Sequence, residues 1–248
     1  MGGQSPIDLG GAAFAGAPAD PVWFHYPVDE VLAEVCFTVH DGDPGPGGVT
    51  LVPGIVVTPE PCGARVEAGS LSFELQSFHW HTPSEHLVEG RAAPLELHLV
   101  HRAGEALLVV AVLSVIGAAD PGIAPAFDLI GRFEPASLRP GEPQCHTALF
   151  VLGDLLPAGR SVVRYDGSLT TAPFTEGVAW VVLREFREAS SAQVESHDRL
   201  VSSALPGFGP RPNPPGNARP VQDLAGRRVF GEGMIGSLPG GERTGGAR

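Results

Sequence analysis

Residues 78–86 read FHWHTPSEH, and residues 96–101 read ELHLVH. Alternating and β-branched residues in both stretches predict β-strands. Successive side chains of a strand point to opposite faces, so His79 and His81 share one face about 7 Å apart, while Trp80 points the other way. Two imidazoles at this separation can coordinate one metal ion.

The second stretch supplies a third imidazole. Alternation puts Glu96, His98 and Val100 on one face of its strand and His101 on the other. If the two strands are neighbours, His98 completes a site of three imidazoles. Three neutral nitrogens with one open position are typical of catalytic zinc, whereas structural zinc is closed by a fourth protein ligand. The pattern therefore predicts a metal site for chemistry.

An ordinary structural role is the alternative, because a lone His-x-His in a strand is usually two surface or core histidines. Here Glu85, His86, Glu96 and His101 crowd the same segment. Buried imidazoles and carboxylates are costly unless they are paired or coordinated, which favours the metal. HWHTPSE also resembles the metal cluster of the cupins. Against a cupin, Phe73 stands where a glycine is expected, and the later Pro/Gly motif ending in His and Asn is missing.

Length and charge limit the class of function. The chain has 248 residues and a formal net charge of −12. This length suits one large β or α/β domain with a sizeable core. No cluster of Lys or Arg offers the basic face that a nucleic acid requires. A small diffusing molecule is the expected partner.

We expect neither a transmembrane helix nor a disulfide bridge. The longest apolar run, residues 107–117, is shorter than the roughly 20 residues that cross a bilayer as a helix, so it predicts a buried strand. Residues 1–9 lack the positive start and apolar core of a secretory signal. The three cysteines, Cys36, Cys62 and Cys145, are widely spaced and odd in number, which predicts ordinary core or loop thiols. Together these features predict a cytoplasmic protein, or a periplasmic or secreted one if the true start lies upstream.

Glycine and proline, 33 and 25 residues, punctuate many short β-type runs. We predict short helices over 124–133 and 191–205 and loops over 41–48 and 205–217. Strands are predicted over 32–39, 47–52, 54–59, 70–81, 95–101, 106–116, 161–169 and 178–186.

Five motifs carry a resemblance to a known family. They are GQSPIDL (3–9), SFHWHTPSEHLVEG (77–90), LELHLVH (95–101), RYDGSLTTAPFTEGVAW (164–180) and NARPVQDLAGR (217–227). In this order they resemble the α-class carbonic anhydrases of the bacterial type. The resemblance implies a mainly β (α+β) fold, a single domain over 1–235 with a large twisted, mostly antiparallel central sheet and a few short peripheral helices. We expect a disordered tail over 236–248 and a missing N-terminal segment.

The resemblance also implies a Zn²⁺ site with His79, His81 and His98 as ligands. Three contacts would orient these imidazoles: Glu96 would accept from His98, the backbone carbonyl of Asn217 would accept from His81, and Ser77 stands where the family has a glutamine beside the first ligand.

The same resemblance assigns the chemistry. Thr170 would accept a hydrogen bond from the zinc-bound hydroxide while donating to Glu85, and the hydroxide would hydrate CO₂ to bicarbonate and a proton. The implied substrate pocket is Val100, Val109, Leu169, Thr171 and Trp180. A carbonic-anhydrase-like binding module without catalysis is the alternative, although known inactive relatives lose a ligand histidine and this chain keeps all three.

Two departures from the family modify these expectations. Ile55 stands where the family's proton-shuttle histidine is expected, so we predict turnover limited by proton transfer unless His25 or His40 substitutes. Phe174 stands where many bacterial relatives have a cysteine bridged to the missing N-terminal segment, which agrees with a chain without that bridge.

Overall fold

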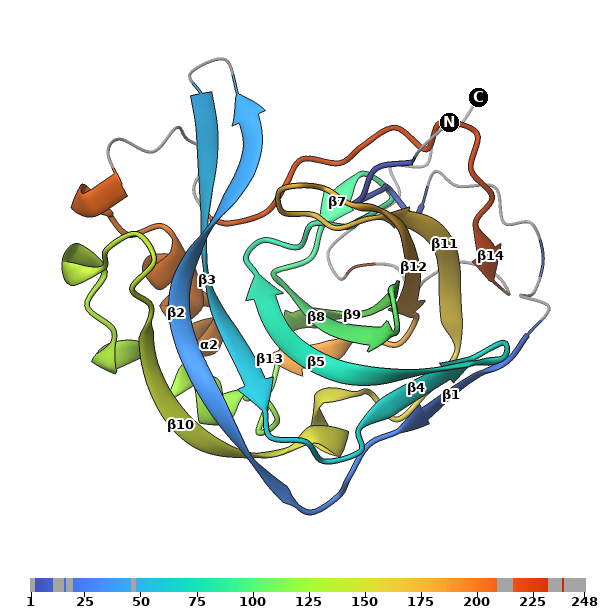
Figure 1. The fold of residues 1–248 in the computed structure, drawn as a ribbon, viewed down its shortest axis with the longest axis horizontal. Helices are drawn as coiled ribbons and strands as arrows, with labels where there is room; N and C mark the ends of the chain where they lie inside the picture. Colours follow the sequence, from blue (N-terminus) through green and yellow to red (C-terminus); the bar gives the residue numbers. More distant parts are fainter. Residues whose placement is uncertain are drawn as a thin grey trace, which may run out of the picture.

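Strands make up most of the regular structure (Figure 1). The structure is a computed structural model and describes residues 3–10, 16, 20–45, 48–208, 216–231 and 238. Its helical segments are α1 Ala124–Phe127, α2 Ser191–Val201, and the 3₁₀ turns η1 Ile130–Arg132, η2 Pro135–Ser137, η3 Leu152–Leu155 and η4 Pro206–Phe208. Its strands are β1 Val22–His25, β2 Glu30–Gly45, β3 Gly48–Pro59, β4 Arg65–Ala68, β5 Leu71–His81, β6 Leu87–Val88, β7 Arg91–Ala92, β8 Leu95–Ala103, β9 Ala106–Ile116, β10 Gln144–Val151, β11 Val162–Ser168, β12 Glu176–Leu183, β13 Arg187–Ala189 and β14 Phe230–Gly231.

Within the described residues these strands form a 12-stranded sheet and a separate β6–β7 pair. The main order is β10-β2-β3-β5-β8-β9-β12-β11-β14, with β1 on β4, β4 also on β5, and β13 on β9. Most pairs are antiparallel, but β12 and β13 both run parallel to β9. The predicted class, a mainly β domain with a large, mostly antiparallel sheet and short helices, is confirmed.

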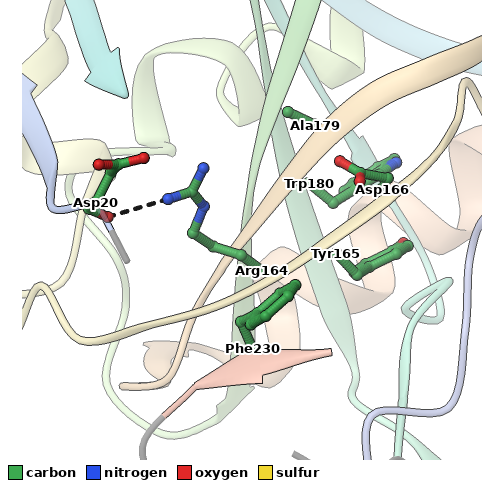
Figure 2. A pocket seen from close by; sticks show the side chains of 7 residues that line it. All are labelled: Asp20, Arg164, Tyr165, Asp166, Ala179, Trp180 and Phe230. Atoms are coloured by element: carbon green, nitrogen blue, oxygen red, sulfur yellow. Dashed lines mark hydrogen bonds between the residues drawn. The ribbon is translucent and has the colours of Figure 1, made fainter. Parts of the chain in front are cut away.

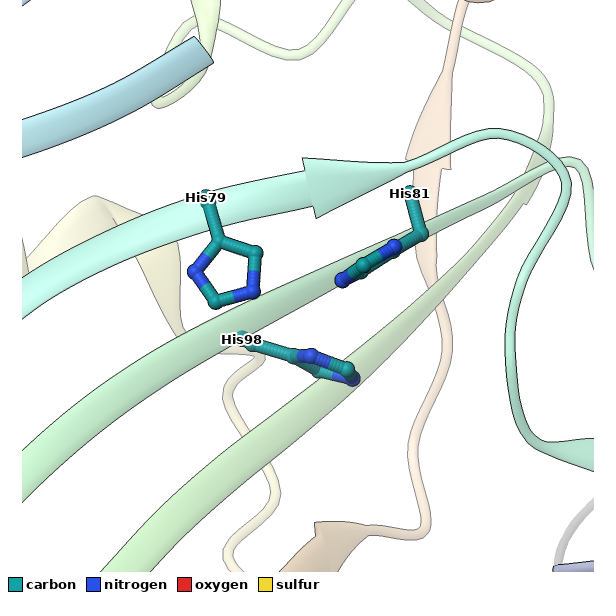
Figure 3. A group of neighbouring side chains, drawn as sticks. All are labelled: His79, His81 and His98. Carbon is teal, nitrogen blue, oxygen red and sulfur yellow. The ribbon is translucent and has the colours of Figure 1, made fainter. Parts of the chain in front are cut away.

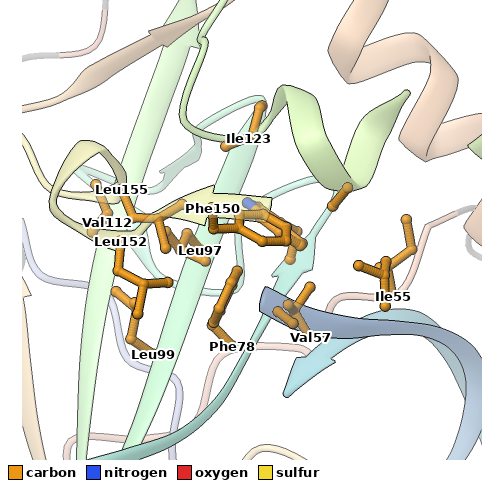
Figure 4. Packing of buried hydrophobic residues seen from close by; sticks show 14 of the residues in the cluster. Ile55, Val57, Phe78, Leu97, Leu99, Val112, Ile123, Phe150, Leu152 and Leu155 are labelled. Carbon is orange, nitrogen blue, oxygen red and sulfur yellow. The ribbon is translucent and has the colours of Figure 1, made fainter. Parts of the chain in front are cut away.

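Strand β9 explains how the sheet builds two cores. Its even-numbered residues from Leu108 to Val112 pack into one cluster, and its odd-numbered residues from Val109 to Leu113 pack into the other. A strand covered on both faces needs a continuous apolar run, which is what the sequence shows. Figure 4 shows the first cluster, where Phe78, Leu97 and Phe150 meet from different strands.

The predicted loop over 41–48 was wrong. Strand β2 continues to Gly45, and β3 begins at Gly48 and pairs with it. The two strands predicted over 47–52 and 54–59 are therefore the single strand β3. An irregularity in the pairing between Asp41 and Pro44 accommodates the proline, which sheets tolerate at such positions.

The prediction of ordinary thiols was wrong for two of the three cysteines. Cys36 on β2 and Cys145 on β10 face each other in the strand register and form a disulfide, while Cys62 is free. Pairing of the two strands brings the sulfurs together although the cysteines are 109 residues apart. The chain therefore has a bridge, and the argument for a reducing compartment loses one of its two supports.

The helices are short, as predicted. The segment predicted as one helix over 124–133 consists of α1 and η1, and α2 begins where predicted but ends at Val201. Ser190 caps α2 in a capping box with Gln193. No helix in the described residues is both long and apolar enough to cross a membrane. The predicted tail over 236–248 lies, apart from Leu238, outside the described residues.

Candidate metal centre

Three histidines from two neighbouring strands face one another. The register of β5 and β8 pairs His79 with His98 and His81 with Glu96, so all four side chains lie on one face of the sheet. The ring centroids of the three histidines are 4.7–5.3 Å apart. Figure 3 shows the three rings facing one another from the two strands. One ring nitrogen from each lies within 4.8 Å of the others. The predicted adjacency of these strands is therefore present.

All three imidazoles are held neutral. Burial lowers the pKa of His79 well below 6.5, and the neighbouring His81 and His98 lower it further. Burial lowers the pKa of His81 to about 4 and also lowers that of His98, with Glu96 opposing both shifts. A neutral imidazole has a free lone pair, which is the form that binds a metal ion.

Hydrogen bonds fix which nitrogen carries that lone pair. A carbonyl or carboxylate can only accept, so Nδ1 of His81 donates to the carbonyl of Asn217 (3.1 Å), and Nε2 of His98 donates to Glu96 (2.8 Å). The free acceptor is then Nε2 of His81, which is buried without a partner among the described residues. An orphaned buried acceptor is costly, and a cation held by these three histidines fits it.

The carboxylate of Glu96 organises the layer behind the ligands. One of its oxygens accepts from the backbone N–H groups of Glu85 and His86 at 2.8 Å each. The other accepts from Nδ1 of His86 (2.5 Å) and Nε2 of His98. Burial alone would raise the pKa of Glu96, but electrostatic interaction with His86 and His98 and these hydrogen bonds hold it well below 4.5. Glu96 is therefore a fully paired anion beneath the site.

Sequence analysis did not assign a role to His86. Its Nε2 bonds to the hydroxyl of Tyr165 at 2.7 Å, and that hydroxyl donates to Ser5 at 3.0 Å. The chain of contacts joins Glu96 to the N-terminal motif. The adjacent pair Glu85 and His86 was the available signal, but the partner Tyr165 lies 79 residues away in the sequence.

Glu85 and Thr170 lie together, as the resemblance implied. Both are buried, and Glu85 accepts from the backbone N–H of Arg219 at 2.8 Å. Burial raises the pKa of Glu85 to about 7, against the lowering effects of His98, the Arg219 amide and a hydrogen bond with the Thr170 side chain. An oxygen of Glu85 lies 3.4 Å from Nδ1 of His81.

A cavity of about 160 Å³ opens beside His79 and His81, which line it. Ser77, Val100, Leu169 and Thr171 from the predicted site line it, and no hydrogen bond joins Ser77 to His79 among the described residues. Val109 and Trp180 are buried in the second core cluster and are not among the lining residues. The lining also includes His40, Val52, Gly54, Val56, His79, Trp80, His81 and Asn217.

The position predicted for the proton shuttle needs a correction. Ile55 is fully buried in the first core cluster and does not face the cavity. The side chains of β3 alternate, so Val52 and Val56 face the cavity together with Gly54. His40 lies opposite Val52 in the β2–β3 register and does face it. His25 instead lies 3.3 Å from Glu67 on the β1–β4 pair.

A second cavity lies against β11 and β12 (Figure 2). It has a volume of about 210 Å³, and the guanidinium of Arg164 donates to the backbone carbonyl of Asp20 at 3.1 Å across it. Its described lining contains no histidine or cysteine. The cavity lined by His79 and His81 is therefore the candidate site for metal chemistry.

Fold and site together define a β-sheet protein with three neighbouring histidines that could hold a metal ion. The sequence model of the eukaryotic-type carbonic anhydrases matches residues 55–233, and the chain belongs to this family. It is 36% identical over 160 residues to a carbonic anhydrase of Pectobacterium atrosepticum, a match that covers 64% of this chain. The matched part spans 58% of that relative's length.

Solved structures agree with the family. An α-carbonic anhydrase of Photobacterium profundum superposes with a TM-score of 0.69 at 28% identity, covering 92% of this chain and 88% of the other. An α-carbonic anhydrase of Thermovibrio ammonificans, in complex with the inhibitor sulfanilamide, gives a TM-score of 0.69 at 30% identity and covers 92% and 86% of the two chains.

Proposed function

We propose that the protein catalyses the reversible hydration of CO₂ to bicarbonate and a proton, with Zn²⁺ held by His79, His81 and His98. The observation that carries this proposal is the unpartnered, buried Nε2 of His81 beside two further neutral imidazoles. When bound there, zinc would supply a Lewis acid that lowers the pKa of water from about 15.7 to about 7.

Thr170 and Glu85 would give the nucleophile its direction. A threonine hydroxyl has one proton to donate. If that proton goes to the Glu85 carboxylate, the oxygen of Thr170 can only accept, and it would hold the proton of an O–H donor at the site on its own side, away from the substrate. Thr170 lies close enough to Glu85 to lower the pKa of that carboxyl group, which supports this role.

The cavity wall suits an uncharged substrate. CO₂ has no net charge and no dipole, so apolar side chains can hold it without the cost of desolvating a polar group. Val56, Val100 and Leu169 supply such a wall beside the ligands. Thr171 adds one hydroxyl, which suits release of the charged product.

The proton must leave the cavity after each turnover. Strand β3 carries no histidine, so the family's usual proton-shuttle histidine is missing. We propose His40 as the residue that takes the proton outward, because it is exposed and lines the same cavity as His79. Transfer over this route is the expected limit of turnover in weak buffer.

Metal analysis of the purified protein and a stopped-flow CO₂ hydration assay, with and without chelator, test the proposal. We expect about one zinc per chain and activity that disappears on chelation and returns with added zinc. Zinc at this stoichiometry without acceleration of CO₂ hydration would contradict catalysis and favour the non-catalytic binding module. Sulfanilamide binding to the zinc-loaded protein would then test whether the cavity accepts a small ligand.

A further inference from the structure

Asn217 binds one short segment with all four of its polar groups. Its backbone N–H donates to the carbonyl of Thr82 (3.2 Å), and its backbone carbonyl accepts from His81 (3.1 Å). Its side-chain oxygen accepts from the N–H of Thr82, and its side-chain nitrogen donates to the carbonyl of Trp80, both at 2.9 Å. Asn217 therefore hydrogen-bonds to His81 and to the residues on both sides of it at the end of β5.

Helix α2 holds the same segment from the other side. The hydroxyl of Thr82 bonds to Nδ1 of His197 at 2.7 Å, while its backbone N–H and carbonyl pair with Asn217. Thr82 is buried, and His197 is fully buried. Every polar group of Thr82 is engaged, so α2 is joined to the ligand segment through an unbroken chain of hydrogen bonds.

An imidazole is a costly choice for position 197. The ring of His197 stacks on Phe127 with centroids 5.3 Å apart and planes within 9°, a place that a phenyl ring would fill equally well. Its Nε2 is buried without a hydrogen-bond partner in the part of the chain that the structure describes, which is unfavourable for a polar atom. Burial, together with nearby His81, lowers the pKa of His197 to about 3, so the ring is neutral. The bond to Thr82 is what an imidazole adds over a phenyl ring.

We propose that His197 is a positioning residue for the metal centre: by holding Thr82 it fixes the end of β5 against Asn217, and with it the direction of the His81 imidazole. The inference rests on the proposed function, because it requires a metal ion at the three histidines. Contacts that orient a metal ligand contribute roughly 10–100-fold to metal affinity. A contact two residues removed from the ligand belongs at the lower end of that range.

The test compares zinc release from the zinc-loaded protein and its His197→Phe variant. Phenylalanine keeps the stack on Phe127, removes the hydrogen bond to Thr82 and also removes the unpartnered Nε2. We expect transfer of zinc to a chelator to be about 10-fold faster, and the visible absorption of the Co²⁺-substituted protein to shift. Unfolding of the metal-free variant should need as much urea as the native protein or more, which a purely structural role would not allow.

Variants of Thr82 and a rescue variant sharpen the test. Thr82→Val should speed zinc release as much as His197→Phe, and the double variant should add little, since both changes break one link. Thr82→Ser and His197→Asn keep a bonding atom near the original place and should restore most of the native rate. The threonine variants carry the test if His197→Phe does not fold.

Leu200→Ala is the matched control. Leu200 is buried on the same helix but belongs to no hydrogen bond of this chain of contacts. We expect a lower urea midpoint and a native rate of zinc release. Native release from both His197→Phe and Thr82→Val, or equal acceleration in Leu200→Ala, would overturn the inference and leave the metal centre intact. Failure of the native protein to bind zinc would overturn the proposed function and this inference together.

Discussion

At the scale of single residues, Glu96 shows how lone pairs and protons set the properties of the site. Each of its two oxygens accepts from two donors, so no position is left for a hydrogen. Glu96→Gln puts an amide N–H₂ against two donors. We expect zinc affinity to fall by roughly 10–100-fold, because His98 loses the acceptor that fixes its tautomer. Competition against a chelator of known affinity measures the change.

The control for this change is Glu74→Gln. Glu74 lies on the same strand as two of the ligands, is exposed, and is equally a glutamate. Its loss should leave zinc affinity within about twofold, as expected for an exposed side chain. Native zinc affinity in Glu96→Gln would show that His98 keeps its orientation without this carboxylate.

His40 gives a second prediction at this scale. His40→Ala should lower kcat on the order of 100-fold in weak buffer, the lower end of general acid–base effects, while kcat/KM stays unchanged because proton export follows bicarbonate release. Imidazole added to the buffer should restore kcat. His25→Ala is the matched control, since His25 is also partly exposed but lies on the β1–β4 pair. An equal loss of kcat in both variants would contradict the assignment.

The residue scale also shows what a sequence can and cannot predict. Strand alternation predicted that His79 shares a face with His81, and that Glu96 shares a face with His98, because a period of two needs no tertiary information. That the two faces meet depends on the pairing of β5 with β8, which the structure supplies. The pairing of His86 with Tyr165 and of Thr82 with His197 joins segments 79 and 115 residues apart. No local pattern encodes such contacts, so they escaped the sequence analysis.

At the scale of elements, the disulfide between Cys36 and Cys145 ties the edge strand β10 to β2. It closes a loop of 109 residues, and constraining such a loop in the unfolded chain stabilises the fold by about 2–5 kcal/mol. Cys145→Ser should therefore lower the free energy of unfolding by this amount. Zinc content should not change, since β10 lines neither cavity described above. Urea unfolding with metal analysis checks both expectations.

Cys62→Ser serves as the control for the disulfide. It removes the cysteine that is free, so its midpoint in urea should stay close to the native one. Treatment of the native protein with a reductant should reproduce the effect of Cys145→Ser and leave that variant itself unaffected. Equal midpoints for the reduced and oxidised native protein would contradict the stabilising role.

Elements were predictable where their pattern is local. Strands β5, β8 and β9 have long alternating or apolar runs, and all three lie where the sequence predicted them. Strand β10 was missed because its Gln, Cys, His and Thr residues give a weak apolar signal. Its strand conformation depends on pairing with β2, which is distant in the sequence. The extension of β2 and β3 through a Pro/Gly segment likewise depends on the pairing partner and not on intrinsic preference.

At the scale of the whole molecule, buried histidines make stability depend on pH. Burial lowers the pKa of His81 and His101 to about 4 and that of His197 to about 3, from 6.5 in each case. Between about pH 6.5 and 4 the unfolded chain therefore binds more protons than the folded chain. Glu85, with its pKa raised to about 7, acts in the opposite sense, but it is one group against these three, and the pKa values of His79 and His98 are lowered as well.

The free energy of unfolding of the metal-free protein should thus fall as the pH falls from 6.5 towards 4. One unit of pKa shift corresponds to about 1.4 kcal/mol, so each of these histidines contributes a loss of about 3 kcal/mol across the window. Urea midpoints between pH 7.5 and 4.5 measure the slope. His101→Gln keeps an amide near the Tyr26 hydroxyl that His101 bonds, and should flatten this slope. His146→Gln, on the edge strand β10, should not. A midpoint that stays constant below pH 6.5 would mean that these imidazoles gain protons without unfolding the chain.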